Sequence, residues 1–161
     1  MSAPTPQLAA LCVSYTICEE CVIHGDPGPY NVVLRNGMPV AFIDWDHACP
    51  GNRMTDVAFA AWTWCLRRIG HIEVADQARR LCEFRHAYGI SDGDALLRAI
   101  ISEQRRVATE AEERLLSATK PEEYDPSHLQ TIGWATIERE HVERHYESLL
   151  GALRSPWRSP P

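Results

Sequence analysis

The chain has 161 residues, a length at which one domain buries roughly 70% of its unfolded surface. Hydrophobic residues make up 45% and charged residues 24%, a globular composition that excludes a disordered or fibrous chain. The net charge of -6 disfavours a general nucleic-acid binder, because a phosphate backbone repels an acidic protein.

The sequence predicts a cytoplasmic protein with no membrane segment. No apolar run approaches the roughly 20 residues that span a bilayer. Residues 1–20 show no basic stretch followed by an apolar core, so we expect no signal peptide. In a reducing compartment the six cysteines are expected to be buried thiols that act as small hydrophobes. They are Cys12, Cys18, Cys21, Cys49, Cys65 and Cys82.

A loop and a hairpin are predicted after a short lead-in that holds one helical stretch, at residues 7–14. The loop begins at His24-Gly25-Asp26, and the prolines and glycine that follow restrict its backbone. Two apolar runs, 32–34 and 40–43, flank an Asn-Gly pair at positions 36 and 37. Both turn residues tolerate positive φ, so the runs should pair as antiparallel strands.

Four helices are predicted after the hairpin. Apolar residues at three- and four-residue spacing mark the first, which should end at Gly70. Gly89 should stop the second, and Ser91 with Asp94 forms a start signal for the third. Residues 154–161 are expected to be a disordered tail. The helices are expected at about residues 57–69, 73–88, 91–117 and 127–153.

The segment from His24 to Asn31 has the form H-x-D-x-x-x-x-N, and Asp44 follows on the turn after the hairpin. Kinase-type phosphoryl transfer uses such a loop, with one Asp as base and an Asn and a later Asp as magnesium ligands. Residues 22–58 combine a His-Gly-Asp loop, an Asn-Val strand, a hairpin, an Ile-Asp-Trp-Asp turn and an Asp that opens an apolar helix. This ordered set resembles the catalytic core of the aminoglycoside phosphotransferase and choline kinase superfamily.

The resemblance implies a reaction and its cofactors. The γ-phosphoryl group of ATP would move to a hydroxyl of a small molecule, which the acidic net charge suggests is cationic. Asp26 would be the catalytic base that orients the hydroxyl. Asn31 and Asp44 would be the magnesium ligands, since both offer the hard oxygen atoms that this ion requires.

The resemblance also implies three supporting residues. His24 would brace the loop through backbone hydrogen bonds, Asp56 would pin the loop from the following helix, and Asp46 would be an extra acid at the metal site. The sequence departs from the family at residues 27–30, which read Pro-Gly-Pro-Tyr where the family has Leu-His-Pro-Gly. Loop shape and substrate preference are therefore open.

A nucleotide-binding lobe is not recognisable in the sequence. Only 23 residues precede His24, and they contain neither Lys nor Gly with which to clamp phosphates. We therefore expect a catalytic and substrate lobe that is inactive alone. Its apolar surface, left without the second lobe, should form a homodimer or bind a separate nucleotide-lobe partner.

Several alternatives remain open at this point. The acids and Asn31 are also typical of an ordinary turn, and Asp56 of a helix start. The chain is alternatively a non-catalytic small-ligand or protein-interaction module, or a structural zinc domain built from Cys18, Cys21, His24, His47 and Cys49. Three tryptophans are either core residues or stacking platforms, namely Trp62, Trp64 and Trp134. Four glutamates line either a cationic-substrate pocket or a solvated face, namely Glu103, Glu110, Glu112 and Glu113.

The fold predicted from these observations is α+β, a protein-kinase-like C-terminal lobe with one β-hairpin and a mostly helical bundle. It should span residues 1–153, with the catalytic loop and hairpin at 21–50 and a helical substrate subdomain at 55–153.

Overall fold

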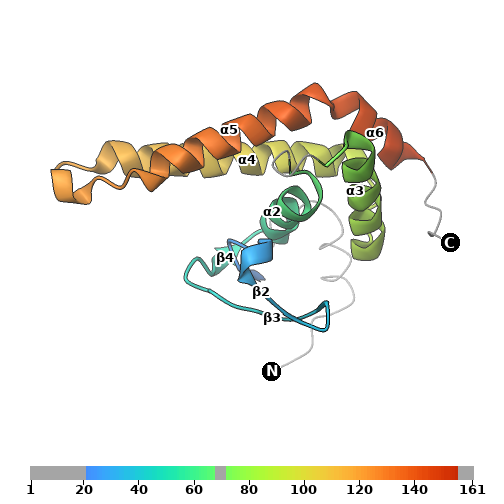
Figure 1. Ribbon diagram of the computed structural model, residues 1–161, viewed down its shortest axis with the longest axis horizontal. Coiled ribbons are helices and arrows are strands. Elements are labelled where there is room, and N and C mark those ends of the chain that lie inside the picture. Colours follow the sequence, from blue (N-terminus) through green and yellow to red (C-terminus); the bar gives the residue numbers. More distant parts are fainter. Residues whose placement is uncertain (1–20, 68–71, 156–161) are drawn as a thin grey trace.

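The computed structural model describes residues 21–67 and 72–155, and it confirms an α+β fold that is mostly helical (Figure 1). The strands are β1 (Cys21–Ile23), β2 (Val32–Arg35), β3 (Met38–Phe42) and β4 (Cys49–Gly51). The α-helices are α2 (Arg53–Cys65), α3 (Val74–Tyr88), α4 (Gly93–Ser117), α5 (Ser127–Arg144) and α6 (Tyr146–Arg154). Short 3-10 turns are η1 (Pro29–Asn31) and η2 (Pro121–Glu123). Within the described ranges, no helix combines the length and apolar character that a bilayer crossing requires.

The helices form one packed body around α2. Helices α4 and α5 run antiparallel as a long pair, α2 packs under α4, and α3 lies beside α6 (Figure 1). The core contains Trp62 of α2, which is fully buried and stacks on Trp134 of α5 with ring centroids 4.2 Å apart. Burial of this apolar surface is the main force that holds the helices together. Leucines from three helices and from the C-cap of α2 complete it, namely Leu66, Leu81, Leu96, Leu97, Leu149 and Leu153.

The predicted hairpin is confirmed. Strands β2 and β3 pair antiparallel, from Val32 opposite Phe42 to Arg35 opposite Met38. Asn36 and Gly37 form the turn with φ values of 53° and 77°, the positive angles that an Asn-Gly pair accommodates without strain. The turn chemistry read from the sequence sets the register up to Leu34, and an irregularity between Val33 and Leu34 shifts the pairing of the remaining residues.

A second strand pair, which the sequence did not predict, frames the loop. Strand β1 pairs antiparallel with β4, so that Ile23 lies opposite Cys49 and Cys21 opposite Gly51. A Cβ on Gly51 would lie 2.8 Å from the Ile23 side chain, which explains a glycine at that position. The pair joins the start of the loop to the residues that lead into α2.

The helix boundaries agree with the predictions at some ends and correct them at others. Helix α3 ends at Gly89, whose φ of 79° is left-handed as expected. Helix α4 is capped by Asp92, not Ser91, because the Asp92 carboxylate accepts hydrogen bonds from the N–H groups of the second and third residues of the helix. The single helix expected at 127–153 breaks at His145 (φ -103°, ψ 12°), which turns the apolar side of α6 onto the core.

Three predictions lie largely or wholly outside the described residues. They are the helical stretch at 7–14, the end of the first helix at Gly70, and the tail at 154–161 beyond Ser155. Helix α2 itself ends at Cys65, five residues before that glycine.

Candidate active site

Asp56 holds the loop that contains the predicted catalytic residues. It lies in the first turn of α2, whose N-cap is Asn52. Its two carboxylate oxygens accept the backbone N–H groups of His24, at 2.7 Å, and Gly25, at 2.9 Å. Charged acceptors make stronger hydrogen bonds than neutral ones, so this pair fixes the loop against the helix. Asp56 thus ties the backbone of His24 and Gly25 to the first turn of α2.

His24 braces the loop from inside. Its side chain is buried, and its Nε2 lies 3.0 Å from the carbonyl oxygen of Ile43, while its Nδ1 accepts the N–H of Asp26 at 3.3 Å. An Nδ1 that accepts leaves Nε2 as the donor to the carbonyl, and the two contacts fix the orientation of the ring. The rings of Phe42 and Trp45 lie against it, with centroids 5.5 and 4.5 Å away.

Asn31 connects the loop to the end of the hairpin. Its side-chain amide donates to the carbonyl oxygen of Asp26 at 3.0 Å, and its own carbonyl accepts the N–H of Ile43 at 3.0 Å. The side chain is buried, so the amide nitrogen is fixed and the side-chain oxygen is the atom left for another ligand. Asp26, Asn31 and the residue before Asp44 therefore belong to one hydrogen-bonded unit.

Asp44 follows directly in a left-handed conformation, with a φ of 64°. A non-glycine residue rarely adopts this angle, and such strain is typical of functional sites. Asp46 lies two residues further on, in the turn closed by the N–H of Ala48 on the carbonyl of Trp45. Among the described residues, no three His, Cys, Asp or Glu side chains come together as a metal site. Asp46 thus completes no three-acid cluster with Asp26 and Asp44.

Gly25 is required by a close approach of two backbone segments. Its φ is 84°, and a Cβ built there would lie 2.6 Å from the carbonyl oxygen of His47. No other residue fits without moving one segment. The structure therefore explains the residue types at the first two positions of the His-Gly-Asp triplet, His24 and Gly25.

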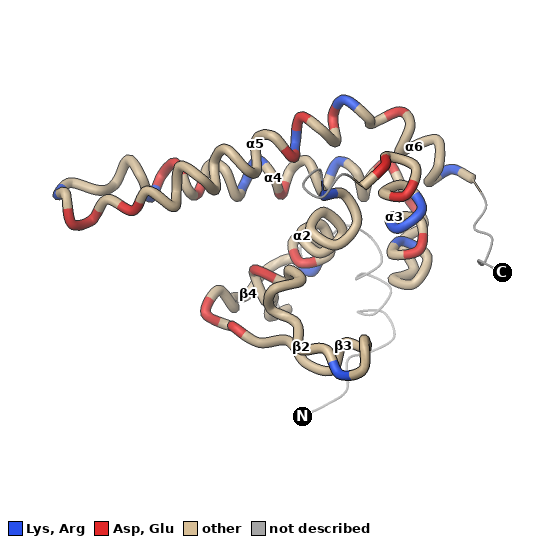
Figure 2. Tube along the Cα trace, viewed as in Figure 1, with Lys and Arg blue, Asp and Glu red and all other residues tan. Residues whose placement is uncertain are grey.

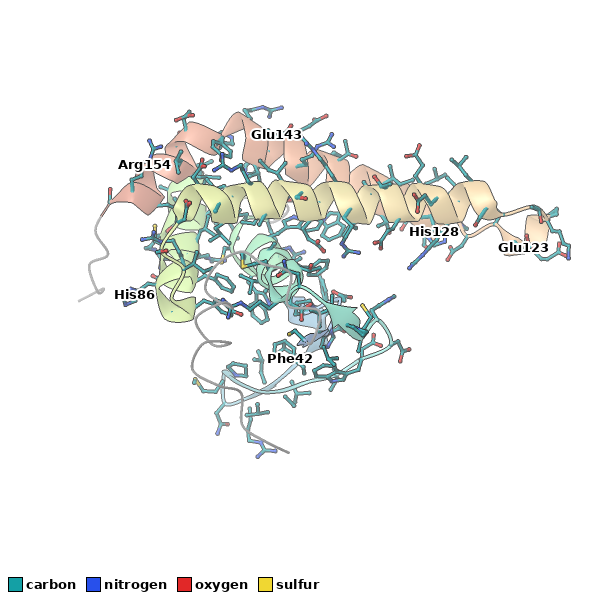
Figure 3. All side chains as sticks on the ribbon, turned by 180° about the vertical axis from the view of Figure 1, so that it is seen from behind. Phe42, His86, Glu123, His128, Glu143 and Arg154 are labelled. Carbon is teal, nitrogen blue, oxygen red and sulfur yellow. The ribbon has the colours of Figure 1, made fainter. Side chains whose placement is uncertain are left out.

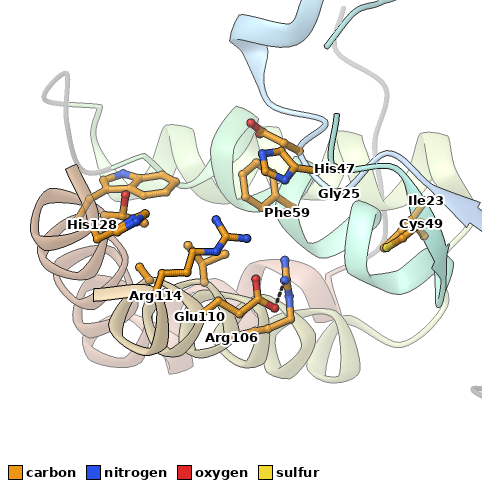
Figure 4. Close-up of a pocket in the computed structure, with 14 residues that line it drawn as sticks. Ile23, Gly25, His47, Cys49, Phe59, Arg106, Glu110, Arg114 and His128 are labelled. Atoms are coloured by element: carbon orange, nitrogen blue, oxygen red, sulfur yellow. Dashed lines mark hydrogen bonds and ion pairs between the residues drawn. The ribbon is translucent and has the colours of Figure 1, made fainter. Parts of the chain in front are cut away.

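Two hollows flank Asp26. A cleft of about 470 Å³ lies between the loop and the α4–α5 pair, and we call it the α4 cleft (Figure 4). A second hollow of about 380 Å³ lies beside Tyr30 and Arg67, where the Arg67 guanidinium donates to the tyrosine hydroxyl at 2.9 Å. Both hollows share Asp26, Phe59 and Trp134, so the aspartate is accessible from either side.

The sequence offered Asp26, Glu110 and Trp134 as candidates for a substrate site, and all three line the α4 cleft, whereas the two arginines of α4 were not predicted. Arg106, Glu110 and Arg114 recur every four residues along α4, a spacing that places them on one face of the helix. The four-residue spacing can be read from the sequence, but only tertiary packing determines which segment this face of α4 meets. The rest of the polar lining comes from other segments, namely His47, Cys49, His128 and Thr131.

The tryptophans divide between core and site. Trp62 is a core residue, whereas Trp134 stacks on it and also lines both hollows. Trp64 is partly exposed, and its indole N–H donates to the carbonyl of Pro27 at 3.1 Å, which adds a further tie to the loop.

The zinc alternative finds no support in the described part of the chain. Cys18 lies outside it, and both ring nitrogens of His24 hydrogen-bond to the protein. Burial raises the pKa of the Cys65 thiol to about 12 and also raises that of Cys82, as expected for thiols that act as hydrophobes. Of the described cysteines only Cys65 is buried as expected, since Cys21 and Cys82 are half-buried and Cys49 is exposed.

Apolar side chains are exposed over the whole hairpin. Arg35 is the only charged residue of residues 31–43, and Phe42 and its neighbours stand apart from the helices (Figures 2 and 3). A two-stranded hairpin is marginally stable by itself, and the described helices leave these apolar side chains exposed. We call it the apolar hairpin surface; it comprises Val33, Leu34, Met38, Val40, Phe42, Ile43 and Trp45.

Comparisons with known proteins agree with the loop geometry. Residues 6–99 match the phosphotransferase enzyme family. Over 143 residues the chain is 30% identical to the trifolitoxin immunity protein of Rhizobium leguminosarum bv. trifolii. That alignment covers 81% of this chain and 52% of the relative, so the chain spans about half the relative's length. No solved structure matches the chain.

Proposed function

Because the chain belongs to the phosphotransferase enzyme family, we propose that it is the catalytic and acceptor-binding lobe of an enzyme that phosphorylates a small-molecule hydroxyl from ATP. The observation that carries the proposal is the hydrogen-bonded unit of His24, Asp26, Asn31 and Asp56. An ordinary turn needs no carboxylate from a helix 32 residues away in the chain to hold its backbone.

Asp26 acts as the general base in this proposal. Its carboxylate takes the proton of the acceptor hydroxyl while the hydroxyl oxygen forms its bond to the γ-phosphorus and the bond to ADP breaks. A Cβ on Gly28 would lie 3.3 Å from Asp26 Oδ1, so the glycine keeps one side of the carboxylate open. Asp56 and His24 act through the loop, by fixing the position of Asp26.

The donor atoms fit magnesium bound to nucleotide phosphates. Asn31 presents an amide oxygen because its nitrogen is held by the Asp26 carbonyl, and Asp44 presents a carboxylate. Magnesium in nucleotide sites takes one or two protein oxygens and fills its remaining positions with phosphates and water. Two protein ligands therefore suffice, and Asp46 is not needed as a third. When bound, the ion neutralises the charge of the transferring phosphoryl group.

The nucleotide lobe is proposed to come from beyond these residues or from a separate polypeptide. The relative is about twice as long as the matched part, and the apolar hairpin surface lies next to Asp44, where a covering lobe would meet the phosphates. Burial of that surface would also stabilise the hairpin.

Calorimetric titration with Mg-ATP tests the proposal. Purified protein should release or absorb heat with Mg-ATP, and Asp44→Ala should abolish the signal because it removes a metal ligand. Asp125→Ala, in the exposed loop that precedes α5, is the matched control and should leave the titration unchanged. A titration that Asp44→Ala leaves intact, or one without heat for the unaltered protein, would contradict the proposal.

A second candidate is a binding module without catalysis. The observation that favours it is the name of the relative, which is an immunity protein. Under this reading the Asp26 loop is a retained scaffold and the apolar hairpin surface binds another protein. Absence of Mg-ATP heat, together with a hairpin-dependent complex, would favour this candidate over the enzyme.

A further inference from the structure

The α4 cleft has an unusual charge pattern beside Asp26. Besides Asp26 and Cys49, its ionisable lining residues are three from helix α4, one from helix α5 and a histidine from the segment before β4. An acceptor that places its hydroxyl at Asp26 from this side must lie against these groups. They are Arg106, Glu110, Arg114, His47 and His128.

Arg106 is already neutralised within the protein. Its guanidinium donates to both oxygens of Glu103, which is buried, and to Glu110 across one helical turn. The hydrogen bonds to Glu103 are the main cause that raises the pKa of Arg106. Two of the glutamates that a cationic substrate would need are therefore bound to an arginine.

Arg114 is the cation left without such a partner. Within residues 21–67 and 72–155, its guanidinium makes no hydrogen bond or ion pair. Figure 4 shows it reaching from α4 into the space below Phe59 and His47, while Glu110 points to Arg106. The guanidinium is thus free to bind a ligand in the cleft.

We infer that the acceptor is a hydroxyl compound that also carries an anionic group, a carboxylate or a phosphate, which Arg114 binds. Arginine presents a planar pair of donors that match either group. An ammonium group in the same cleft would face Arg114 and find both nearby glutamates occupied. The negative charge inferred for the acceptor is opposite to the one expected from the net charge of the chain. The residues that line a site decide which ligand it recognises, whereas the net charge of the chain does not. The inference rests on the proposed function, since it assumes that the acceptor meets Asp26.

Three short hydroxyl compounds that differ mainly in charge test the inference. They are 4-hydroxybutyrate, 1,4-butanediol and choline, each titrated into the 15N-labelled chain without nucleotide or magnesium. We expect the anion to bind more tightly than the other two and to shift the amide signals of the α4 cleft. Added sodium chloride should weaken the binding, because the guanidinium is exposed to solvent.

Arg114→Gln should weaken binding of the anion by about fivefold to tenfold, the loss of one exposed charge-assisted contact. Arg105→Gln is the matched control on the same helix, since Arg105 contacts Glu143 and does not line the cleft. Arg114→Glu should reverse the preference towards choline, and unchanged far-UV circular dichroism shows that each variant folds.

Tighter binding of choline to the unaltered chain, or binding of the anion that Arg114→Gln does not weaken, overturns the inference. The titration of hydroxyl compounds contains no nucleotide, so its result can be interpreted even if the Mg-ATP titration fails. Failure of this inference can therefore be distinguished from failure of the proposed function.

Discussion

Replacement of Asp56 by alanine should strongly destabilise the protein, because Asp56 alone supplies the side-chain acceptor for two loop N–H groups. Both N–H groups, of His24 and Gly25, are in partly buried hydrogen bonds. A buried donor left without a partner costs about 1–3 kcal/mol, so the pair amounts to roughly 2–6 kcal/mol. Loss of a negative charge from the first turn of α2 adds about 0.3–1 kcal/mol.

Urea unfolding followed by circular dichroism measures this loss. A small domain has a stability of about 5–15 kcal/mol and a urea slope of about 1–3 kcal/mol per molar, so the midpoint should fall by more than about 1 M. Asp56→Asn keeps one acceptor oxygen and should lose roughly half as much.

Asp76→Ala is the control for the helix-dipole contribution. Asp76 lies in the first turn of α3 and is exposed, and its side chain holds no loop. Its replacement should cost less than about 1 kcal/mol. If Asp56→Ala destabilises the protein no more than Asp76→Ala, Asp56 does not pin the loop as assigned.

Three further outcomes are expected. Gly25→Ala should lower the free energy of unfolding by about 1–3 kcal/mol, because the alanine would be held in a left-handed conformation and would collide with His47. Urea unfolding measures this loss, and an unchanged midpoint would refute the close approach of the two segments. Cys49 should react with a thiol reagent in the folded protein and Cys65 only after unfolding, as peptide mapping by mass spectrometry can check; equal labelling would contradict the burial. Stability should fall as pH rises from about 9 to 12, because the folded pKa values of Cys65 and Tyr146 are both about 12 and the unfolded chain loses these protons first. Cys65→Ala should flatten this loss in urea unfolding at a series of pH values, and an unaltered slope would show that the thiol is not the source.

The loop and the hairpin were predictable because local chemistry determines them. Asn36 and Gly37 adopt the positive φ values that their residue types favour, and the pairing next to the turn follows from it. The pairing of Asp56 with the loop was available only through the family resemblance, since the two segments lie 32 residues apart in the chain.

Other features depend on tertiary packing and left no clear local signal. The break at His145 occurs within a pattern that reads as one continuous helix, and it is explained only by the core that α6 covers. Strand β4 contains Pro50, and at three residues it is too short for a periodic pattern. The role of Arg114 depends on which face of α4 meets the loop, a choice that helical spacing alone does not make.

The measurement that most directly tests the central claim is paramagnetic broadening of amide signals by manganese bound with ATP, in place of magnesium. We predict that the signals of Asp26, Asn31 and Asp44 broaden first and together, and that Asp44→Ala removes the effect. Broadening that centres instead on the exposed acids of α4, or that Asp44→Ala does not change, would contradict a shared metal and phosphate site at the end of the hairpin.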